Sequence, residues 1–312
     1  MNLEQLRGFA EIAETGHFTR AAEQLHLAQP SLSRQIAALE TDLGVELFQR
    51  TRGNVSLTAA GERLLPLARR MLTDADTARN EMAELAGLRK GRIRLGAPPT
   101  LCTTLVPEVL AEFHERYPGI DIRILESGSR SLIAALMEGS LDLALIVTGV
   151  SSGAARAVLE RETILAERLV AVSAAAAPSP FGATVSLAEL ALVPQVLFPE
   201  NYDLRATMDT AFRGADLDPR VAVEGAEMDA TLRFVERGIG VAVVPALVAA
   251  MRPELRVTPL RDTSLARTVS LAKRSDMAPT RAAAALQAVI REVSGRFVTG
   301  DRGIAQLVTR LG

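Results

Sequence analysis

The chain has 312 residues, of which 48% are hydrophobic and 23% are charged, and its formal net charge is −2. This composition excludes a mainly disordered protein, and one cysteine (Cys102) with three histidines excludes an intramolecular disulfide and a cysteine–histidine zinc site, so we expect neither metal nor cofactor. Because no apolar run reaches the roughly 18–20 residues that cross a bilayer and the first residues carry no export signal, we expect a cytoplasmic protein with no membrane partner.

The first 25 residues predict two short amphipathic helices. Apolar residues recur at spacings of three and four in the first of them: Leu3, Leu6, Phe9, Ala10 and Ala13. Asn2 and Gln5 form a predicted N-terminal capping pair, and Gly16 is expected to end the helix. Thr19 is a predicted cap for the second helix, which places Ala21, Ala22 and Leu25 inward.

A third helix is expected after a short turn at residues 26–29. Pro30 fits its first position, where a missing N–H costs nothing, and Leu32, Ile36 and Leu39 share one face. The segments 47–50 and 55–57 predict a small hairpin about the turn 51–54. The hairpin would lie beside the helices as a wing.

A long helix is predicted from the cap Thr58 to about residue 88. Its apolar residues again recur by threes and fours: Leu64, Leu67, Met71, Ala75, Ala78, Met82 and Leu85. At about 1.5 Å per residue this helix is roughly 45 Å long, which is more than a small domain can cover. We therefore expect the seam to pair with a second copy of the chain, with Pro66 as a bend near its start.

From residue 92 onward, strands and helices alternate. Strands are predicted at 93–95, 120–125, 141–147, 195–198, 221–224, 239–244 and 269–272, and helices at 105–114, 132–137, 204–212, 229–236 and 280–297. Such alternation predicts a parallel sheet in two α/β lobes, followed by a short polar tail.

The sequence as a whole resembles the LysR-type transcriptional regulators. The most specific matches are LRGF (6–9), GHFTRAAEQL (16–25), QPSLSRQI (29–36), LE (39–40), LGVELFQR (43–50) and LTAAG (57–61). Weaker matches are FHERYPGI (113–120), LMEGSLDLA (136–144) and VERGIGVAVVP (235–245). Ala28 departs from the family pattern, in which a serine often caps the third helix.

The resemblance implies an α/β protein with an N-terminal all-α winged helix-turn-helix, a long linker helix and a two-lobed periplasmic-binding-protein-like effector domain. The implied domains are 1–58 for DNA binding, with the helix-turn-helix at 18–37, 59–90 for the dimerising linker, and 91–298 for the effector domain. Lobe I then takes 91–162 and 268–298, lobe II takes 163–267, and 299–312 form the tail.

For DNA binding, the resemblance implies that the exposed face of the third helix contacts base edges. The expected contacts, including the helix before it and the wing, are Thr19, Gln29, Pro30, Ser31, Ser33, Arg34, Gln35, Arg50 and Arg52. Arg34 can donate two hydrogen bonds to a guanine, whereas Arg50 and Arg52 suit phosphates or the minor groove. The alternative is that these side chains are ordinary solvated surface groups.

Residues 1–58 contain five arginines against seven acidic residues, so one copy lacks a basic footprint. We therefore expect a dimer or tetramer that binds double-stranded promoter DNA, with RNA polymerase as a further expected partner.

For the effector domain, the resemblance implies a small-molecule inducer of unknown identity in a cleft between the lobes. The corresponding residues are Pro99, Thr100, Leu101, Cys102, Ser127, Ser129, Thr148, Phe198, Asn201, Glu227 and Pro245. Free N–H groups and hydroxyls near Thr100 and Thr103 suit a carboxylate, although both threonines could instead cap a helix, and the cleft residues fit amides as well as acids. Burial as a small apolar residue is the alternative for Cys102.

Three other functions have less support from the sequence. An enzyme lacks support, since no nucleophile elbow or metal-binding histidine pair occurs, and GIG (238–240) precedes a strand rather than following one. A cysteine-dependent redox regulator lacks a resolving thiol. A transport binding protein is opposed by the N-terminal winged domain. We expect ligand binding to close or tilt the lobes and so to shift the DNA-binding domains of the oligomer.

Overall fold

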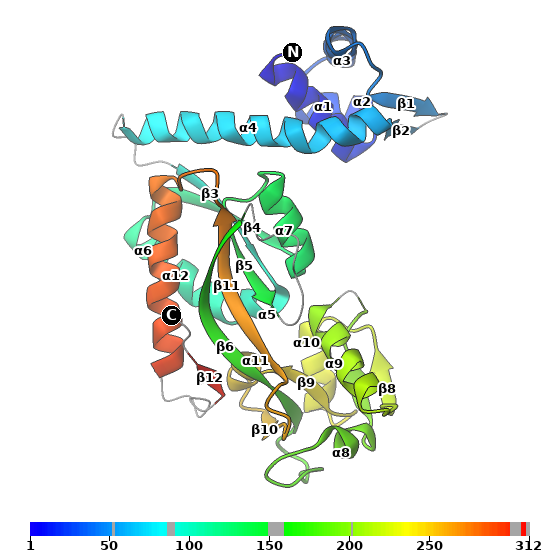
Figure 1. The fold of residues 1–312 in the computed structure, drawn as a ribbon, viewed down its shortest axis with the longest axis vertical. Coiled ribbons are helices and arrows are strands. Elements are labelled where there is room, and N and C mark those ends of the chain that lie inside the picture. The colour runs from blue at the N-terminus through cyan, green and yellow to red at the C-terminus, as the bar shows by residue number, and fades with distance from the viewer. Residues whose placement is uncertain (52–53, 86–90, 149–158, 201, 300–306, 310–312) are drawn as a thin grey trace. The chain divides into compact units, whose positions relative to one another are not determined.

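The computed structural model describes residues 1–312 except 52–53, 86–90, 149–158, 201, 300–306 and 310–312. The chain forms two compact units (Figure 1). The first comprises Met1–Gly91 with Ala135–Leu141, and the second comprises Arg92–Ala134 with Asp142–Gly312. Within the described ranges, every helix is too short or too polar to cross a lipid bilayer.

The first unit is built from helices around a small hairpin. Its elements are α1 (Leu3–Thr15), α2 (Phe18–Gln24), α3 (Gln29–Leu43), β1 (Phe48–Thr51), β2 (Asn54–Leu57) and α4 (Ala59–Leu85). The predicted cap of α1 is confirmed, since the side-chain carbonyls of Asn2 and Gln5 each accept the other residue's backbone N–H at 2.9 Å. Gly16 ends α1 with φ of 67°, a geometry that strains residues with a Cβ.

The expected cap of α2 is wrong. The helix begins at Phe18, so His17 is at the N-cap position without a side-chain bond, and Thr19 is an exposed residue of the first turn. The ring of Phe18 packs edge-on against Phe48, with the ring centroids 5.8 Å apart. The start of α2 therefore packs on the hairpin through an aromatic contact and has no hydroxyl cap.

The third helix begins one residue earlier than predicted. Gln29 is its first residue, which makes Pro30 the second, and Ala28 provides no side-chain cap. A proline is still tolerated there because the first four N–H groups of a helix lack intrahelical partners. The Gln29 side chain donates to Ser33 Oγ, four residues farther along the helix, at 3.0 Å.

The entry to α4 confirms the predicted cap at Thr58. The Thr58 hydroxyl oxygen accepts the Gly61 N–H at 3.1 Å, and the hydroxyl donates to the Glu46 carbonyl at 2.7 Å. A Cβ on Gly61 would lie 2.2 Å from the Leu47 carbonyl oxygen, so only glycine allows this close approach of helix and hairpin. Pro66 is inside the helix, as expected.

The core of the first unit joins the helices to the hairpin. Its buried hydrophobic members are Leu6, Phe9, Ile12, Ala21, Ala22, Leu32, Ile36, Leu39, Leu47, Phe48 and Ala68. They are the inward stripes that the periodicity predicts for the first three helices. Burial of one face of α3 leaves its opposite face available to a partner.

The second unit is α/β. Its strands are β3 (Gly91–Ala97), β4 (Ile120–Glu126), β5 (Leu143–Thr148), β6 (Leu159–Ala174), β7 (Gln195–Leu197), β8 (Val221–Glu224), β9 (Ala242–Pro245), β10 (Leu255–Pro259), β11 (Ala266–Arg274) and β12 (Val308–Thr309). Its helices are α5 (Pro99–Cys102), α6 (Leu105–Arg116), α7 (Ser129–Met137), α8 (Leu187–Ala191), α9 (Asp203–Gly214), α10 (Met228–Glu236), α11 (Ala246–Ala250) and α12 (Arg281–Thr299).

The sheet is mixed, so the prediction of a parallel sheet is wrong in part. Its order is β10-β6-β11-β5-β3-β4, with β9 and β12 also pairing with β6. β3 and β5 are parallel, as are β7 and β8 in a separate two-stranded sheet, but β11 is antiparallel to both β5 and β6. The local pattern of alternating elements does not show that β11 returns from the far end of the domain.

The long strand β6 was not predicted, and neither was β12. β6 pairs first with β11 and then with β9 and β10, so it runs from one part of the sheet to the other (Figure 1). Charged residues such as Glu160, Arg161 and Glu167 interrupt its apolar pattern. The expected polar tail contains β12, in which Val308 is buried and pairs with Glu167 of β6.

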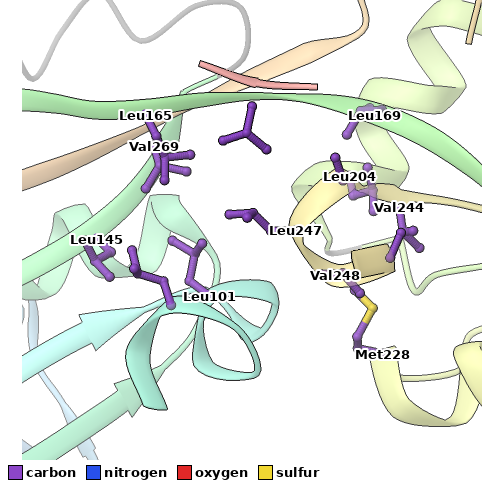
Figure 2. Packing of buried hydrophobic residues seen from close by; sticks show 14 of the residues in the cluster. Leu101, Leu145, Leu165, Leu169, Leu204, Met228, Val244, Leu247, Val248 and Val269 are labelled. Carbon is purple, nitrogen blue, oxygen red and sulfur yellow. The ribbon is translucent and has the colours of Figure 1, made fainter. Parts of the chain in front are cut away.

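One hydrophobic core spans the second unit. Leu101 of α5 and Leu145 of β5 lie on one side of Leu247 of α11, and Met228 and Val244 lie on the other (Figure 2). Because α11 packs between the two groups, a change in its position affects both parts of the sheet.

Candidate nucleic-acid interface and effector region

The exposed side of α3, which we call the recognition face, carries Gln29, Ser31, Ser33, Arg34 and Gln35. Gln29 and Arg34 are exposed, and the other three are half-buried. The Arg34 guanidinium has no ion-pair partner among the described residues, so its donors are free for a base edge or a phosphate. Five of the nine expected DNA contacts thus lie on α3, as does Pro30.

A surface concavity of about 290 Å³ adjoins the recognition face. Residues from α3 line one side, and the start of α1, which sequence reasoning missed, lines the other: Asn2, Glu4, Gln5, Ser31, Arg34, Gln35 and Ala38. The capping pair of Asn2 and Gln5 is the sequence signal that could have pointed to the start of α1. The Gln35 side-chain oxygen is buried there without a partner.

The wing contributes the hairpin β1–β2, with Phe48 opposite Leu57 and Thr51 opposite Asn54. Arg50 lies in β1 opposite Val55. Arg52 lies outside the described residues, so its expected contact stays a prediction.

The predicted seam of α4 divides between two environments. Leu64 packs against the core of its own unit. Leu67, Met71 and Met82 are 52%, 39% and 59% exposed, Ala78 is exposed and Ala75 is half-buried. The spacing of 67, 71, 78 and 82 is that of a helix-pairing seam, while Leu85 is in the helix but its side chain is not described.

In the second unit, α5 holds four of the expected effector residues. Thr100 is 4% exposed, and its hydroxyl oxygen accepts a hydrogen bond from Arg267 Nη1 at 2.9 Å. Thr103 is the C-cap residue of α5, and its hydroxyl donates to the Pro99 and Thr100 carbonyls. Neither Thr100 nor Thr103 is the N-cap residue of a helix, because α5 begins after Pro98 and α6 after Thr104, so the capping alternative holds only at the C-terminal end of α5, for Thr103.

Cys102 and Tyr202 share an acidic environment. Burial, together with the negative charge of Glu126, raises the pKa of the Cys102 thiol to about 12. Burial also raises the pKa of Tyr202, whose hydroxyl bonds the Glu227 carboxylate and lies within the field of Glu126. The Cys102 thiol donates to the Ala97 carbonyl at 3.6 Å. Both groups therefore stay protonated at neutral pH.

The starts of α7 and α9 meet at Ser129. Its backbone N–H donates to the Asp203 carboxylate at 3.3 Å, and its hydroxyl oxygen accepts the Val147 N–H at 3.0 Å. The α7 start is thus brought against α9, which follows Tyr202. We use the term effector region for α5, the start of α7, and the starts of α9 and α10.

The other expected effector residues surround this region or lie apart from it. The Ser127 N–H donates to the Ala97 carbonyl at 3.2 Å, and Phe198 stacks on Tyr202 with ring centroids 5.6 Å apart. Pro245 ends β9 and precedes α11. Thr148 ends β5 but its side chain is not described, and Asn201 lies outside the described residues. Sequence reasoning missed Glu126, Tyr202, Asp203, Glu167 and Arg267, which carry no local motif.

Two family models match this chain. The bacterial regulatory helix-turn-helix protein, lysR family, matches residues 3–62, and the LysR substrate binding domain matches residues 86–295. These limits lie near the domain boundaries expected from the sequence, which themselves stay predictions.

Similar proteins span almost the whole chain. HTH-type transcriptional regulator IlvR of Caulobacter vibrioides is 33% identical over 302 residues, covering 94% of this chain and 98% of that protein. Full-length CbnR complexed with its target DNA is 27% identical with a TM-score of 0.67, covering 94% of this chain and 100% of that one. A full-length OxyR variant from Pseudomonas aeruginosa is 27% identical with a TM-score of 0.70, covering 93% and 95%. The chain therefore belongs to the LysR family of DNA-binding transcriptional regulators, with a winged helix-turn-helix followed by a two-lobed substrate-binding domain.

Proposed function

We propose that this regulator selects its promoter sites through the recognition face of α3, with Arg34 as the residue that distinguishes a guanine. The observation that carries this proposal is the exposed Arg34 guanidinium without an ion-pair partner among the described residues. A guanidinium presents two parallel donors that match the two acceptors of a guanine in the major groove. Ser31 and Ser33 suit phosphate or water-bridged contacts.

The regulator acts as a homo-oligomer, a dimer or tetramer paired along the exposed seam of α4. Support comes from the acidic balance of residues 1–58, because one copy with few free cations binds DNA weakly. Two linked copies multiply that affinity without new contacts. RNA polymerase is the proposed downstream partner, the cytoplasm is the proposed location, and the protein is proposed to have no catalytic activity of its own.

A small molecule bound at the effector region controls the regulator. The carboxylates of Glu126, Asp203 and Glu227 favour a ligand that donates hydrogen bonds, such as an amide or amine, over an acid. A cysteine-dependent redox response is the weaker alternative, because a thiol with a pKa of about 12 is protonated and this is the only cysteine in the chain.

Footprinting of the DNA upstream of the chain's own gene tests the proposal. We expect full-length protein at moderate salt to protect a defined segment, and the Arg34→Ala variant to lose that protection while still binding DNA weakly. Absence of any protected segment for the parent protein contradicts the proposed site selection. Equal protection by the variant removes Arg34 from it.

A further inference from the structure

A buried ion pair in the second unit is formed by two residues that the sequence does not single out. The side chain of Glu167 on β6 is completely buried, and that of Arg267 on β11 is 10% exposed. Arg267 Nε donates to Glu167 Oε1 at 2.9 Å, and Nη2 lies 2.7 Å from the same oxygen in an ion-pair contact that is not a hydrogen bond. Buried pairs of this kind seldom stabilise a fold more than apolar residues of the same volume. The presence of this pair is therefore better explained by the groups that it positions than by a contribution to stability.

The ion pair lies where β6 changes its partners. Glu167 is opposite Arg267 in the β6–β11 register, and two residues farther along Leu169 is opposite Pro245 of β9. Beyond that point β6 pairs with β9 and β10 (Figure 1). A side chain at this position can contact elements from both parts of the sheet.

Each member of the pair holds a different helix. Arg267 Nη1 donates to the Thr100 hydroxyl oxygen of α5 at 2.9 Å. The second oxygen of Glu167, Oε2, accepts the Leu247 N–H at the start of α11 at 3.0 Å. A continuous chain of contacts therefore runs from α5 through the two charged side chains to α11. All four residues are buried, so water does not compete for these bonds.

We propose that Arg267 is a positioning residue that couples α5 to α11, so that a displacement of Thr100 is transmitted to the other part of the sheet. This inference rests on the proposed effector region, because α5 belongs to that region. A ligand that moves the Thr100 hydroxyl weakens its hydrogen bond to Arg267. The guanidinium then rotates relative to the Glu167 carboxylate. The same carboxylate holds the first turn of α11, which packs at the centre of the core.

The experiment is hydrogen exchange of the full-length protein, read by mass spectrometry of peptides, with no DNA and no effector. Thr100→Val keeps the shape of the side chain but removes the oxygen that accepts from Arg267. We expect exchange in the peptide that contains Leu247 to become several-fold to about tenfold faster, the size expected for weakening one charged hydrogen bond. Residue 100 makes no hydrogen bond to the peptide that contains Leu247. Faster exchange in that peptide therefore measures the coupling between α5 and α11.

Thr103→Val is the matched control, because it removes a hydroxyl from the turn after α5 without touching Arg267. It should change exchange near α5 and leave α11 as in the parent. Arg267→Met is the second variant and should accelerate exchange in both helices, with circular dichroism as the check that the chain is folded.

Unchanged exchange at Leu247 in a folded Thr100→Val protein overturns the coupling. An equal effect of Thr103→Val at α11 overturns it as well, since any loosening of that turn would then suffice. Both outcomes are independent of DNA protection, so the proposed function and the coupling can fail separately.

Discussion

Replacement of Arg34 separates sequence choice from general DNA affinity. The side chain is exposed and has no ion-pair partner among the described residues, so Arg34→Ala should change the free energy of unfolding by less than about 0.5 kcal/mol. A bidentate contact to guanine discriminates against other bases by about 1–3 kcal/mol, which is roughly 5- to 150-fold in affinity. The loss should therefore be confined to one base pair in each half-site.

The assay is fluorescence anisotropy on a preferred site selected from random duplexes, with each base pair substituted in turn. Arg34→Lys keeps the charge but not the paired donors, so it should retain the salt dependence and lose the discrimination. Arg237→Ala removes an exposed arginine of the second unit and should change neither. If Arg34→Ala lowers affinity by the same factor at every substituted site, Arg34 contacts phosphate only and the assignment is wrong.

Three further predictions concern packing, the thiol and the oligomer. Gly61→Ala forces a Cβ to within 2.2 Å of the Leu47 carbonyl oxygen and should lower the Tm by several degrees. In the control variant Gly214→Ala, the added Cβ meets no atom within 4 Å, and the Tm should stay unchanged. Equal Tm values for the two variants contradict this prediction. The Cys102 pKa of about 12 predicts that iodoacetamide alkylates this thiol at pH 8 on the order of a thousandfold more slowly than a free thiol of pKa about 8.5. The alkylation rate should rise about tenfold per pH unit. A rate that reaches a plateau below pH 10 refutes the prediction. Met71→Asp on the exposed seam should lower the oligomeric mass in analytical ultracentrifugation and weaken binding at every DNA site. If both the mass and the DNA affinity are unchanged, the seam has no part in oligomer assembly.

Features that depend on neighbouring residues were predictable from the sequence. The capping pair at Asn2 and Gln5, the stop at Gly16 and the cap at Thr58 were all confirmed, because each acts within three or four residues. The buried stripe of α3 was predictable from the same short periodicity. The exposed face of α3 was predictable as well, because it is the side of the helix that this stripe does not occupy. The start of α2 at Phe18 was missed because no side chain caps it, and the ring of Phe18 packs on Phe48, which is 30 residues away in the sequence.

Features that depend on distant parts of the chain appeared only in the tertiary structure. β6 and β12 are strands because of their partners, and the local pattern of β6 is interrupted by charges that become buried or paired after folding. Glu167 and Arg267 are 100 residues apart, and Arg267 and Thr100 are 167 apart. The sequence by itself determined the family, through its resemblance to the LysR-type motifs. It also determined the helical units, since local hydrogen bonds and periodic burial encode them. Only the tertiary structure decided which polar side chains meet in the effector region. The physical reason is that a charged side chain is buried only where a distant part of the chain supplies a partner that pairs with it.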